Sequence, residues 1–252
     1  MIDNIKVSVV SYLNSKPFLY GIERSGLLEK IDLHLDIPSM CAQKLIEDKV
    51  DIGLIPVAAI PLLKQHFILS DYCIGAVGKV SSVMLYSDVP LADIKKILLD
   101  YQSRTSVTLV KILAKEFWNI TPEWIPASRH FENQINNTTA AVIIGDRTFG
   151  LENRYAFVYD LAEEWQKFTN LPFVFACWVA NKKLSDDFIA DFNQALKFGM
   201  DNRRELIKEL ELTSDYKTDI EKYLNRSISY EYDNSKKRAL ALFLDYMGKL
   251  EQ

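Results

Sequence analysis

Short apolar runs alternate with stretches of helical periodicity over the first two thirds of the chain. Each run is four to ten residues long or close to it, which is typical of buried strands, and apolar residues at helical spacing follow several of them. These strand-like runs occupy 5–10, 31–37, 50–55, 79–87, 138–146 and 171–180. A strand–helix–strand succession predicts an α/β fold with a largely parallel, twisted sheet and helices on its faces.

Helical periodicity dominates the chain after residue 180. Ser185 suits the N-cap of a helix that begins at Asp186, and a final helix is predicted over 235–250. We expect Lys236 and the two basic residues after it to face solvent. Two βα blocks followed by a return strand indicate two lobes joined by two crossings, with a ligand cleft between them. The predicted lobes are 1–87 plus 177–252, and 88–176.

Composition excludes several classes of protein. The 252 residues are 48% hydrophobic and 25% charged, which suits one large globular domain or two lobes. The net charge is −4 and no Lys/Arg run stands out, so we expect no nucleic-acid partner. No stretch approaches the roughly 18 apolar residues of a membrane span, so no membrane is expected. The N-terminus carries Asp3 and no long apolar core, which argues against a secretory signal and for the cytoplasm.

Familiar catalytic and cofactor motifs are missing from the sequence. The cysteines, Cys41, Cys73 and Cys177, are isolated and odd in number, which indicates free thiols rather than a zinc site or a disulfide framework. The three histidines lack metal-like partner spacing. No GxSxG, HExxH, Walker or GxGxxG pattern occurs, so we expect no metal and no dinucleotide cofactor.

Four segments share a strand that ends in small or polar residues, usually just before a helix. They are 10–14, 55–58, 99–106 and 144–147. In open α/β sheets, ligands bind beyond the carboxyl ends of the strands. A helix N-terminus adds free amides and a positive dipole end, which suit a carboxylate or a phosphate. The sequence therefore predicts a binding site where these strand ends meet.

The segment 103–106 is the strongest of the four. Ser103, Thr105 and Ser106 are candidate N-caps whose backbone amides would point at an anion. Arg104 offers a bidentate clamp for a carboxylate. The alternative is an ordinary capped helix with a surface arginine, and spacing alone does not decide between the two.

The segment 11–14 also has two interpretations. Ser11 and Asn14 can hydrogen-bond a polar ligand and Tyr12 can stack on it, or the segment is an Asx-type turn that caps the following helix. Elsewhere the candidates are less specific. The hydroxyls of Ser81 and Ser82, in an apolar strand, either face a ligand or bond locally. Asp146, which follows Gly145 at the end of the strand 138–146, either accepts a substrate hydroxyl or caps the next helix. Pro56 fits the first turn of a helix.

Taken together, these segments resemble the chorismate dehydratases of the futalosine route to menaquinone. The motifs that carry the resemblance fall in the same order and extend from about residue 5 to 180: SYLNSKP, DIGLIPVAAI, SSVMLYS, SRTS, GD after a strand, and DLAEEWQKFTNLPFVFACW. One departure is GDRTFG, where Arg147 and Phe149 replace smaller, more apolar residues. This departure leaves the role of Asp146 open.

The resemblance implies a two-lobe fold of the type II periplasmic-binding-protein class with an interlobe cleft. It implies loss of water from chorismate, giving 3-[(1-carboxyvinyl)oxy]benzoate, without a cofactor or a metal. Our hypothesis is that Asn14 orients the substrate, and that the substrate's own enolpyruvyl carboxylate takes the ring proton. Ser82, or Ser81, would then hold a carboxylate or the leaving hydroxyl. The expected substrate-binding residues are Ser11, Tyr12, Pro56, Ser81, Arg104, Thr105, Ser106, Gly145 and Asp146.

Two rival interpretations remain. The first is a sibling enzyme of the same pathway, a dihydroxynaphthoate synthase of the same fold. The SYLN motif and the position of the histidines argue against it. The second is a binding protein that holds a small anion without chemistry, because a fold does not determine a function. The sequence does not indicate an oligomeric state.

Overall fold

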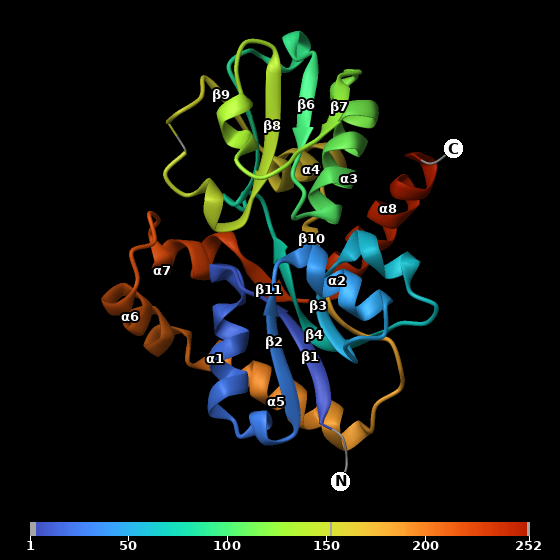
Figure 1. Cartoon of the computed structure of the whole chain (residues 1–252), viewed down its shortest axis with the longest axis vertical. Helices are drawn as coiled ribbons and strands as arrows, with labels where there is room; N and C mark the ends of the chain where they lie inside the picture. The colour runs from blue at the N-terminus through green and yellow to red at the C-terminus, as the bar shows by residue number, and fades with distance from the viewer. Residues whose placement is uncertain (1–3, 152, 251–252) are drawn as a thin grey trace.

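The strands form two separate sheets in the computed structural model, which describes residues 4–151 and 153–250 (Figure 1). The larger sheet has the order β11-β4-β10-β3-β1-β2, and the smaller has the order β7-β6-β8-β5-β9. The larger sheet consists of β1 (Ile5–Val10), β2 (Ile31–Asp36), β3 (Ile52–Pro56), β4 (Phe67–Ala76), β10 (Phe173–Ala180) and β11 (Ser229–Glu231). The smaller sheet consists of β5 (Val83–Ser87), β6 (Lys96–Leu99), β7 (Glu123–Pro126), β8 (Thr139–Ile144) and β9 (Phe157–Asp160).

Both sheets are mixed rather than largely parallel. In the larger sheet β1 pairs in parallel with β2 and β3, whereas β10 is antiparallel to β3 and β4. In the smaller sheet β6 is parallel to β7 and β8, whereas β5 is antiparallel to β8 and β9. These antiparallel pairs involve β5 and β10, the strands that follow the two crossings between the sheets, and β11 is a further antiparallel partner of β4.

The sheet boundary differs from the predicted lobe boundary. We expected residues up to 87 to belong to the first lobe, but β5 is the strand that pairs with β8 and β9. The chain therefore leaves the larger sheet after Ala76 and enters the smaller sheet at Val83. It returns at Phe173, a little before the predicted position of residue 177. We propose lobe boundaries at these crossings.

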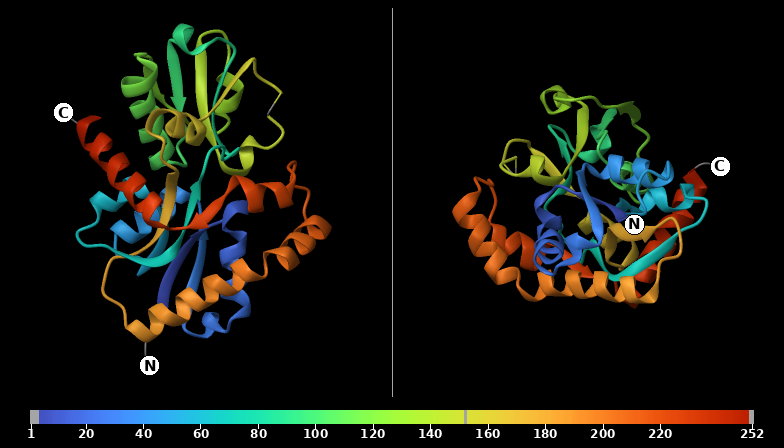
Figure 2. Two further views of the ribbon diagram at one scale, coloured as in Figure 1. Left: turned by 180° about the vertical axis from the view of Figure 1, so that it is seen from behind. Right: turned by 60° about the horizontal axis from the view of Figure 1, so that its bottom comes forward.

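Helices cover both sheets and connect the lobes. Helix α2 packs on β3 and β1, α5 packs on α1 and β4, and α8 contacts both β10 and α3. Figure 2 shows α5 lying across the larger lobe and α8 rising from it toward the smaller lobe. The helices are α1 (Lys16–Arg24), α2 (Pro38–Ile46), α3 (Arg104–Leu113), α4 (Leu161–Thr169), α5 (Asp186–Asp201), α6 (Arg203–Thr213), α7 (Ile220–Lys222) and α8 (Asn234–Leu250).

The core follows from the apolar runs. Every residue of β3 and of β10 is buried, because both strands lie inside the larger sheet with helices on its two faces. The cap expected at Ser185 also forms, since its hydroxyl accepts the Phe188 amide at the start of α5. The three cysteines are buried free thiols, as predicted.

Several local predictions differ from the structure. Pro56 is the last residue of β3 rather than the start of an α-helix, and a short 3-10 helix, Val57–Leu62, follows it. Pro61 inside that helix removes an amide donor, which prevents a longer α-helix. Lys236, which we expected on a solvated face, is only 1% exposed. Its ammonium donates to the Ser229 hydroxyl at 2.7 Å and to the Glu231 carbonyl at 2.6 Å, so it is satisfied inside the protein.

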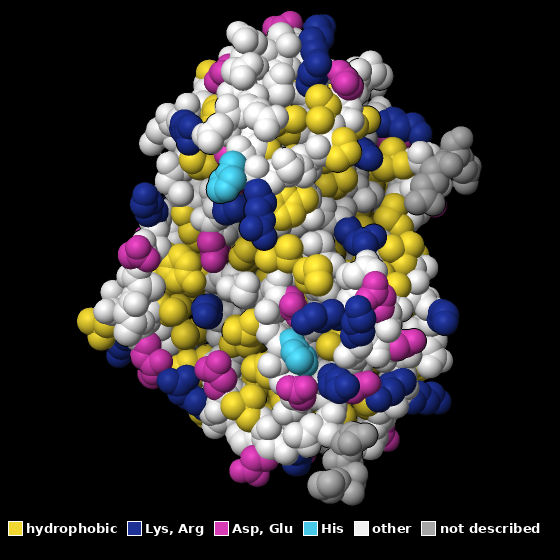
Figure 3. Space-filling model, in the orientation of Figure 1, with side chains coloured by type: hydrophobic (Ala, Val, Ile, Leu, Met, Phe, Trp, Pro, Cys, Tyr) yellow, Lys and Arg dark blue, Asp and Glu magenta, His cyan; other side chains and the backbone are white. Residues whose placement is uncertain are grey.

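Within residues 4–151 and 153–250, no helix combines the length and the apolar character needed to cross a membrane. On the face shown in Figure 3, acidic and basic side chains are interspersed rather than gathered into a patch of one sign.

Candidate functional site

A cavity lies between the two lobes, where the carboxyl ends of β1, β3 and β8 meet the first turn of α3. The space between its lining atoms is about 510 Å³, part of which is open to solvent. Its walls are mostly apolar with a few converging polar groups, which is the usual composition of a small-molecule site. The polar side chains are Tyr12, Asn14, Ser15, Ser82, Ser103, Thr105 and Ser106, and the remaining lining residues are Val10, Pro38, Pro56, Ile74, Val80, Val83, Ile144, Gly145, Phe175 and Ala176.

Asn14 occupies a 3-10 helix, Leu13–Ser15, directly after β1. The Ser15 hydroxyl donates to Asn14 Oδ1 at 3.1 Å, and the hydroxyl of Tyr230 donates to the Asn14 backbone carbonyl at 3.0 Å. Asn14 is therefore held through both its side chain and its backbone, with the amide on the cavity wall. The alternative of an Asx-type cap is not observed, because no side chain caps this helix or α1.

Ser82 lines the same cavity as Asn14 and directly precedes β5. It is 1% exposed, and its hydroxyl accepts a hydrogen bond from Tyr223 at 2.7 Å. Tyr223 comes from a π-helical turn, Tyr223–Ser227, close to the C-terminus. Sequence reasoning missed this residue because it lies outside the segments that carry the motifs, and no spacing connects it with Ser82.

The first turn of α3 lines the opposite part of the cavity. Ser103 is the N-cap, since its hydroxyl accepts the Ser106 amide at 3.0 Å while donating to the Ser106 hydroxyl at 2.9 Å. The Thr105 hydroxyl connects the lobes, because it accepts a hydrogen bond from the Ala58 amide at 3.2 Å and donates one to the Phe175 carbonyl at 3.1 Å. Of the three candidate caps, only Ser103 caps the helix.

Arg104 lies outside the cavity, contrary to the carboxylate clamp that we expected. Its guanidinium donates to the Gln43 side-chain oxygen at 3.2 Å and lines an outer groove beside Lys111 and Trp124. The reason is helical geometry, because adjacent positions of a helix point about 100° apart. With Thr105 and Ser106 directed at the cavity, Arg104 points away from it.

Ser11 and Ser81 are also outside the cavity lining. Ser11 is exposed, and its backbone amide donates to the Asp36 carbonyl at 3.0 Å. Ser81 is exposed in a left-handed conformation with φ +62°, and its amide donates to the Asp160 carboxylate at 2.7 Å. The left-handed residue turns the chain so that Ser82, and not Ser81, reaches the cavity.

Asp146 connects the lobes rather than lining the cavity. Both of its carboxylate oxygens lie 3.1 Å from the Leu13 amide, which donates to them across the cleft. Burial raises the pKa of Asp146 to about 6, and the Leu13 amide and the charge of Lys16 partly oppose that rise. Neither of the two roles that we considered from the sequence, a substrate acceptor or a helix cap, matches this position.

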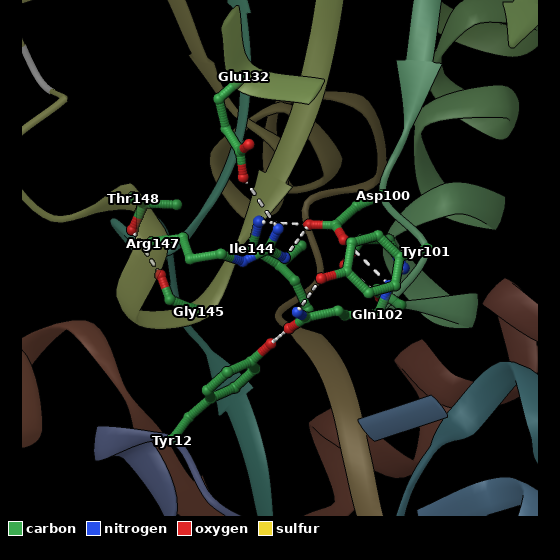
Figure 4. Close-up of polar contacts among 11 residues, drawn as sticks. Tyr12, Asp100, Tyr101, Gln102, Glu132, Ile144, Gly145, Arg147 and Thr148 are labelled. Carbon is green, nitrogen blue, oxygen red and sulfur yellow. Dashed lines mark hydrogen bonds and ion pairs between the residues drawn. The ribbon is translucent and has the colours of Figure 1, made fainter. Parts of the chain in front are cut away.

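A polar network extends from the cavity into the smaller lobe (Figure 4). The Tyr12 hydroxyl donates to Gln102, and Gln102 in turn donates to the Tyr101 hydroxyl at 2.8 Å. Arg147 lies between two carboxylates, pairing with Asp100 and, at 3.1 Å, with Glu132. The guanidinium is thus engaged with protein carboxylates, and burial raises the pKa of the Tyr12 phenol despite the opposing charge of Arg147.

The part of the chain that the structure describes contains no set of metal ligands. No group of three or more His, Cys, Asp or Glu side chains there is arranged to hold an ion.

Solved structures similar to this chain have the periplasmic-binding-protein architecture. A protein from Archaeoglobus fulgidus superposes with a TM-score of 0.73 at 16% identity, covering 98% of this chain and 97% of its own. A Candida albicans gene product described as having the generic periplasmic binding protein fold gives a TM-score of 0.65 at 13% identity, over 100% and 92% of the chains. The periplasmic aliphatic sulphonate binding protein of Escherichia coli superposes with a TM-score of 0.62 at 16% identity, covering 100% of this chain and 87% of its own. The predicted two-lobe fold is confirmed.

One curated relative is the chorismate dehydratase of Thermus thermophilus. It is 28% identical over 153 residues, which is 53% of this chain and 56% of the relative, so the alignment spans about half of each protein. A family model described as menaquinone biosynthesis covers far more of the chain, from residue 5 to residue 249. This match includes both lobes and the cavity between them, and the chain therefore belongs to the menaquinone biosynthesis family.

Proposed function

We propose that the protein is a chorismate dehydratase, a hydro-lyase that removes water from chorismate to give 3-[(1-carboxyvinyl)oxy]benzoate. The observation that carries this proposal is the meeting of Asn14 and Ser82 on the wall of one interlobe cavity. These are the residues to which our hypothesis gives the orientation of the substrate and the contact with a carboxylate or the leaving hydroxyl. The 28% identity to a chorismate dehydratase supports the same conclusion.

The reaction needs donors for developing negative charge. The ring proton beside the ether oxygen leaves, its electron pair becomes a new ring double bond, and the adjacent hydroxyl departs as water. Negative charge develops on the ring and spreads into the ring carboxylate, so donors aimed at that carboxylate lower the barrier. Because Arg104 points away, we assign this task to the first turn of α3 and to the Ser106 hydroxyl, whose oxygen already accepts from Ser103.

The proton acceptor is the second requirement. Among the residues that the structure describes, those lining the cavity carry no carboxylate, imidazole or amine. Chorismate itself brings a carboxylate on its enolpyruvyl group, close to the proton that leaves. We assign the base to that carboxylate, and Asn14 to holding the substrate so that the carboxylate reaches the proton. An intramolecular base of this kind benefits from the high effective concentration of a tethered group.

Incubation of the purified protein with chorismate, followed by detection of the aromatic product, tests the proposal. Asn14→Ala is expected to lower kcat by about a hundredfold or more, the usual effect of losing a positioned polar group in an active site. Asn14→Asp separates two roles: it retains activity only if a carboxylate at this position can supply the base. Full turnover by Asn14→Ala would remove Asn14 from the mechanism.

Arg104→Ala is the matched control. It replaces the residue that the sequence favoured as a carboxylate clamp, but whose guanidinium donates to Gln43 in the structure. We expect kcat/KM near the wild-type value, and a large loss would return Arg104 to the site.

A non-catalytic binding protein is the competing function, favoured by the similarity to the sulphonate binding protein. Binding of chorismate, measured by calorimetry, without product formation would support it. Product formation from the cyclised futalosine derivative and not from chorismate would instead identify the sibling enzyme.

A further inference from the structure

The Tyr223 hydroxyl lies beside both of the proposed reacting residues. The Ser15 hydroxyl donates to Asn14 Oδ1 at 3.1 Å. The Asn14 side chain also lowers the pKa of the nearby Tyr223 phenol, against the rise that burial causes. Tyr223 then donates to Ser82 Oγ at 2.7 Å. Tyr223 is thus the link between Asn14 of the larger lobe and Ser82 at the entrance to the smaller lobe.

The directions of these hydrogen bonds follow from counting protons. A tyrosine hydroxyl has one proton, and that of Tyr223 goes to Ser82. Any contact of Asn14 with the Tyr223 oxygen falls to the asparagine NH₂ group, since Asn14 Oδ1 is the acceptor for Ser15. Ser82 receives the final hydrogen bond, and its own proton is then directed away from Tyr223, toward the cavity that Ser82 lines.

Tyr223 is built to remain a donor. Only 2% of its surface is exposed, and its ring packs edge-on against Phe149 with the centroids 5.1 Å apart. Burial raises the pKa of the phenol well above its ordinary value, so the hydroxyl keeps its proton throughout the physiological pH range. A carboxylate or a titratable imidazole at this place would not act as a hydrogen-bond donor throughout that pH range.

We propose that Tyr223 is a positioning residue for the dehydration. By donating to Ser82, it directs the Ser82 proton toward the hydroxyl that leaves chorismate, where oxygen gains negative charge as the C–O bond breaks. Its oxygen also lies beside the Asn14 side chain, which lines the same cavity as Ser82. This inference rests on the proposed function, because the leaving hydroxyl is that of chorismate.

Tyr223→Phe is the direct test, since it removes the hydroxyl and keeps the ring against Phe149. We expect kcat to fall by about tenfold to a hundredfold, with KM close to wild type, because the lost contact acts mainly in the transition state. Tyr216→Phe is the control. The ring of Tyr216 packs against the same Phe149 with the centroids 6.4 Å apart, and Tyr216 is not among the cavity-lining residues. Tyr216→Phe should therefore leave kcat unchanged.

A double-mutant cycle distinguishes positioning from a structural effect. If Tyr223 acts through Ser82, then Tyr223→Phe should lower kcat little further in a Ser82→Ala protein. Fully additive losses would overturn the proposal, and so would a wild-type kcat for Tyr223→Phe. Wild-type protein that binds chorismate but forms no aromatic product would overturn the proposed function itself, and this inference with it.

A second variant covers the case in which Tyr223→Phe does not fold. Site-specific replacement of Tyr223 by 3-fluorotyrosine keeps the packing and makes the phenol a stronger acid. A stronger donor polarises Ser82 further, so kcat should rise. An unchanged or lower kcat in this folded variant would contradict the role of the Tyr223 proton.

Discussion

At the scale of single residues, the cavity is closed by a contact that only glycine allows. Gly145 has a left-handed backbone with φ +66°, and a Cβ there would lie 2.6 to 2.8 Å from three ring atoms of Tyr12. Its amide also donates to the Ser82 carbonyl at 2.8 Å. Gly145 thus places the Tyr12 ring, whose hydroxyl reaches Gln102 in the smaller lobe, against the segment that carries Ser82.

Gly145→Ala is expected to lower both stability and activity. The left-handed backbone costs a non-glycine residue about 1–2 kcal/mol, and displacement of the Tyr12 ring adds to this cost. Urea unfolding measures the first effect, and turnover or binding of chorismate measures the second.

Gly26→Ala is the matched control for this prediction. Gly26 is also left-handed, with φ +76°, but a Cβ there meets nothing within 4 Å. Gly26→Ala should therefore show the backbone cost alone, with unchanged activity. Equal losses of stability and activity in the two variants would show that the contact with Tyr12 is unimportant.

At the scale of elements, the position of the Asn14 segment depends on how α1 packs on α5. Helix α1 begins directly after the 3-10 helix that contains Asn14. A Cβ on Gly21 would lie 2.0 Å from the Ala195 carbonyl oxygen, and one on Gly199 would lie 1.9 Å from the Pro17 carbonyl oxygen. The two helices are therefore in backbone-to-backbone contact, which requires glycine on both sides.

Gly199→Ala is predicted to separate the helices and to destabilise the protein by about 1–3 kcal/mol or more, as overpacking does in a well-packed interior. The urea midpoint measures this loss. Gly248→Ala, in α8, has open space at its Cβ and should instead stabilise the protein by up to about 1 kcal/mol, since alanine favours a helix interior. A Gly199→Ala protein as stable as wild type would mean that the helices can move apart at little cost.

At the scale of the whole molecule, the lobes are connected by hydrogen bonds as well as by two crossings of the chain. Thr105 of α3 bonds with Ala58 and Phe175, which belong to the larger lobe. Asp146 accepts the Leu13 amide, and Tyr12 donates to Gln102 across the same cleft. These contacts surround the cavity, so the arrangement of the lobes and the shape of the site depend on each other.

Thr105→Val tests this connection at constant volume. The valine leaves the buried Ala58 amide and Phe175 carbonyl without their partner, and the expected loss is about 1–3 kcal/mol in the free energy of unfolding. Thr108→Val, one turn later on α3, loses only a bond to its own helix at the Arg104 carbonyl and should cost much less. Similar losses in the two variants would argue that Thr105 contributes nothing specific to the connection between the lobes.

The candidate site was predictable in part. Tyr12, Asn14 and Ser82 line the cavity, as do Pro56, Thr105, Ser106 and Gly145, because each follows or precedes a strand end that faces the cleft. Their roles in catalysis remain predictions. Ser11, Ser81, Arg104 and Asp146 point elsewhere, since the direction of a side chain depends on local backbone angles and on partners distant in the sequence.

By itself, the sequence determined the elements that depend on local information. Apolar runs and periodicity specify strands and helices because side chains within one element are neighbours in the sequence, and the ordered motifs pointed to the two-lobe fold and to the family that the comparisons confirm. Only the tertiary structure decided which polar groups meet. Ser82 and Tyr223 are 141 positions apart, and Leu13 and Asp146 are 133 apart. No local pattern encodes such pairs, because they form only after the core has brought both lobes and the C-terminal segment together.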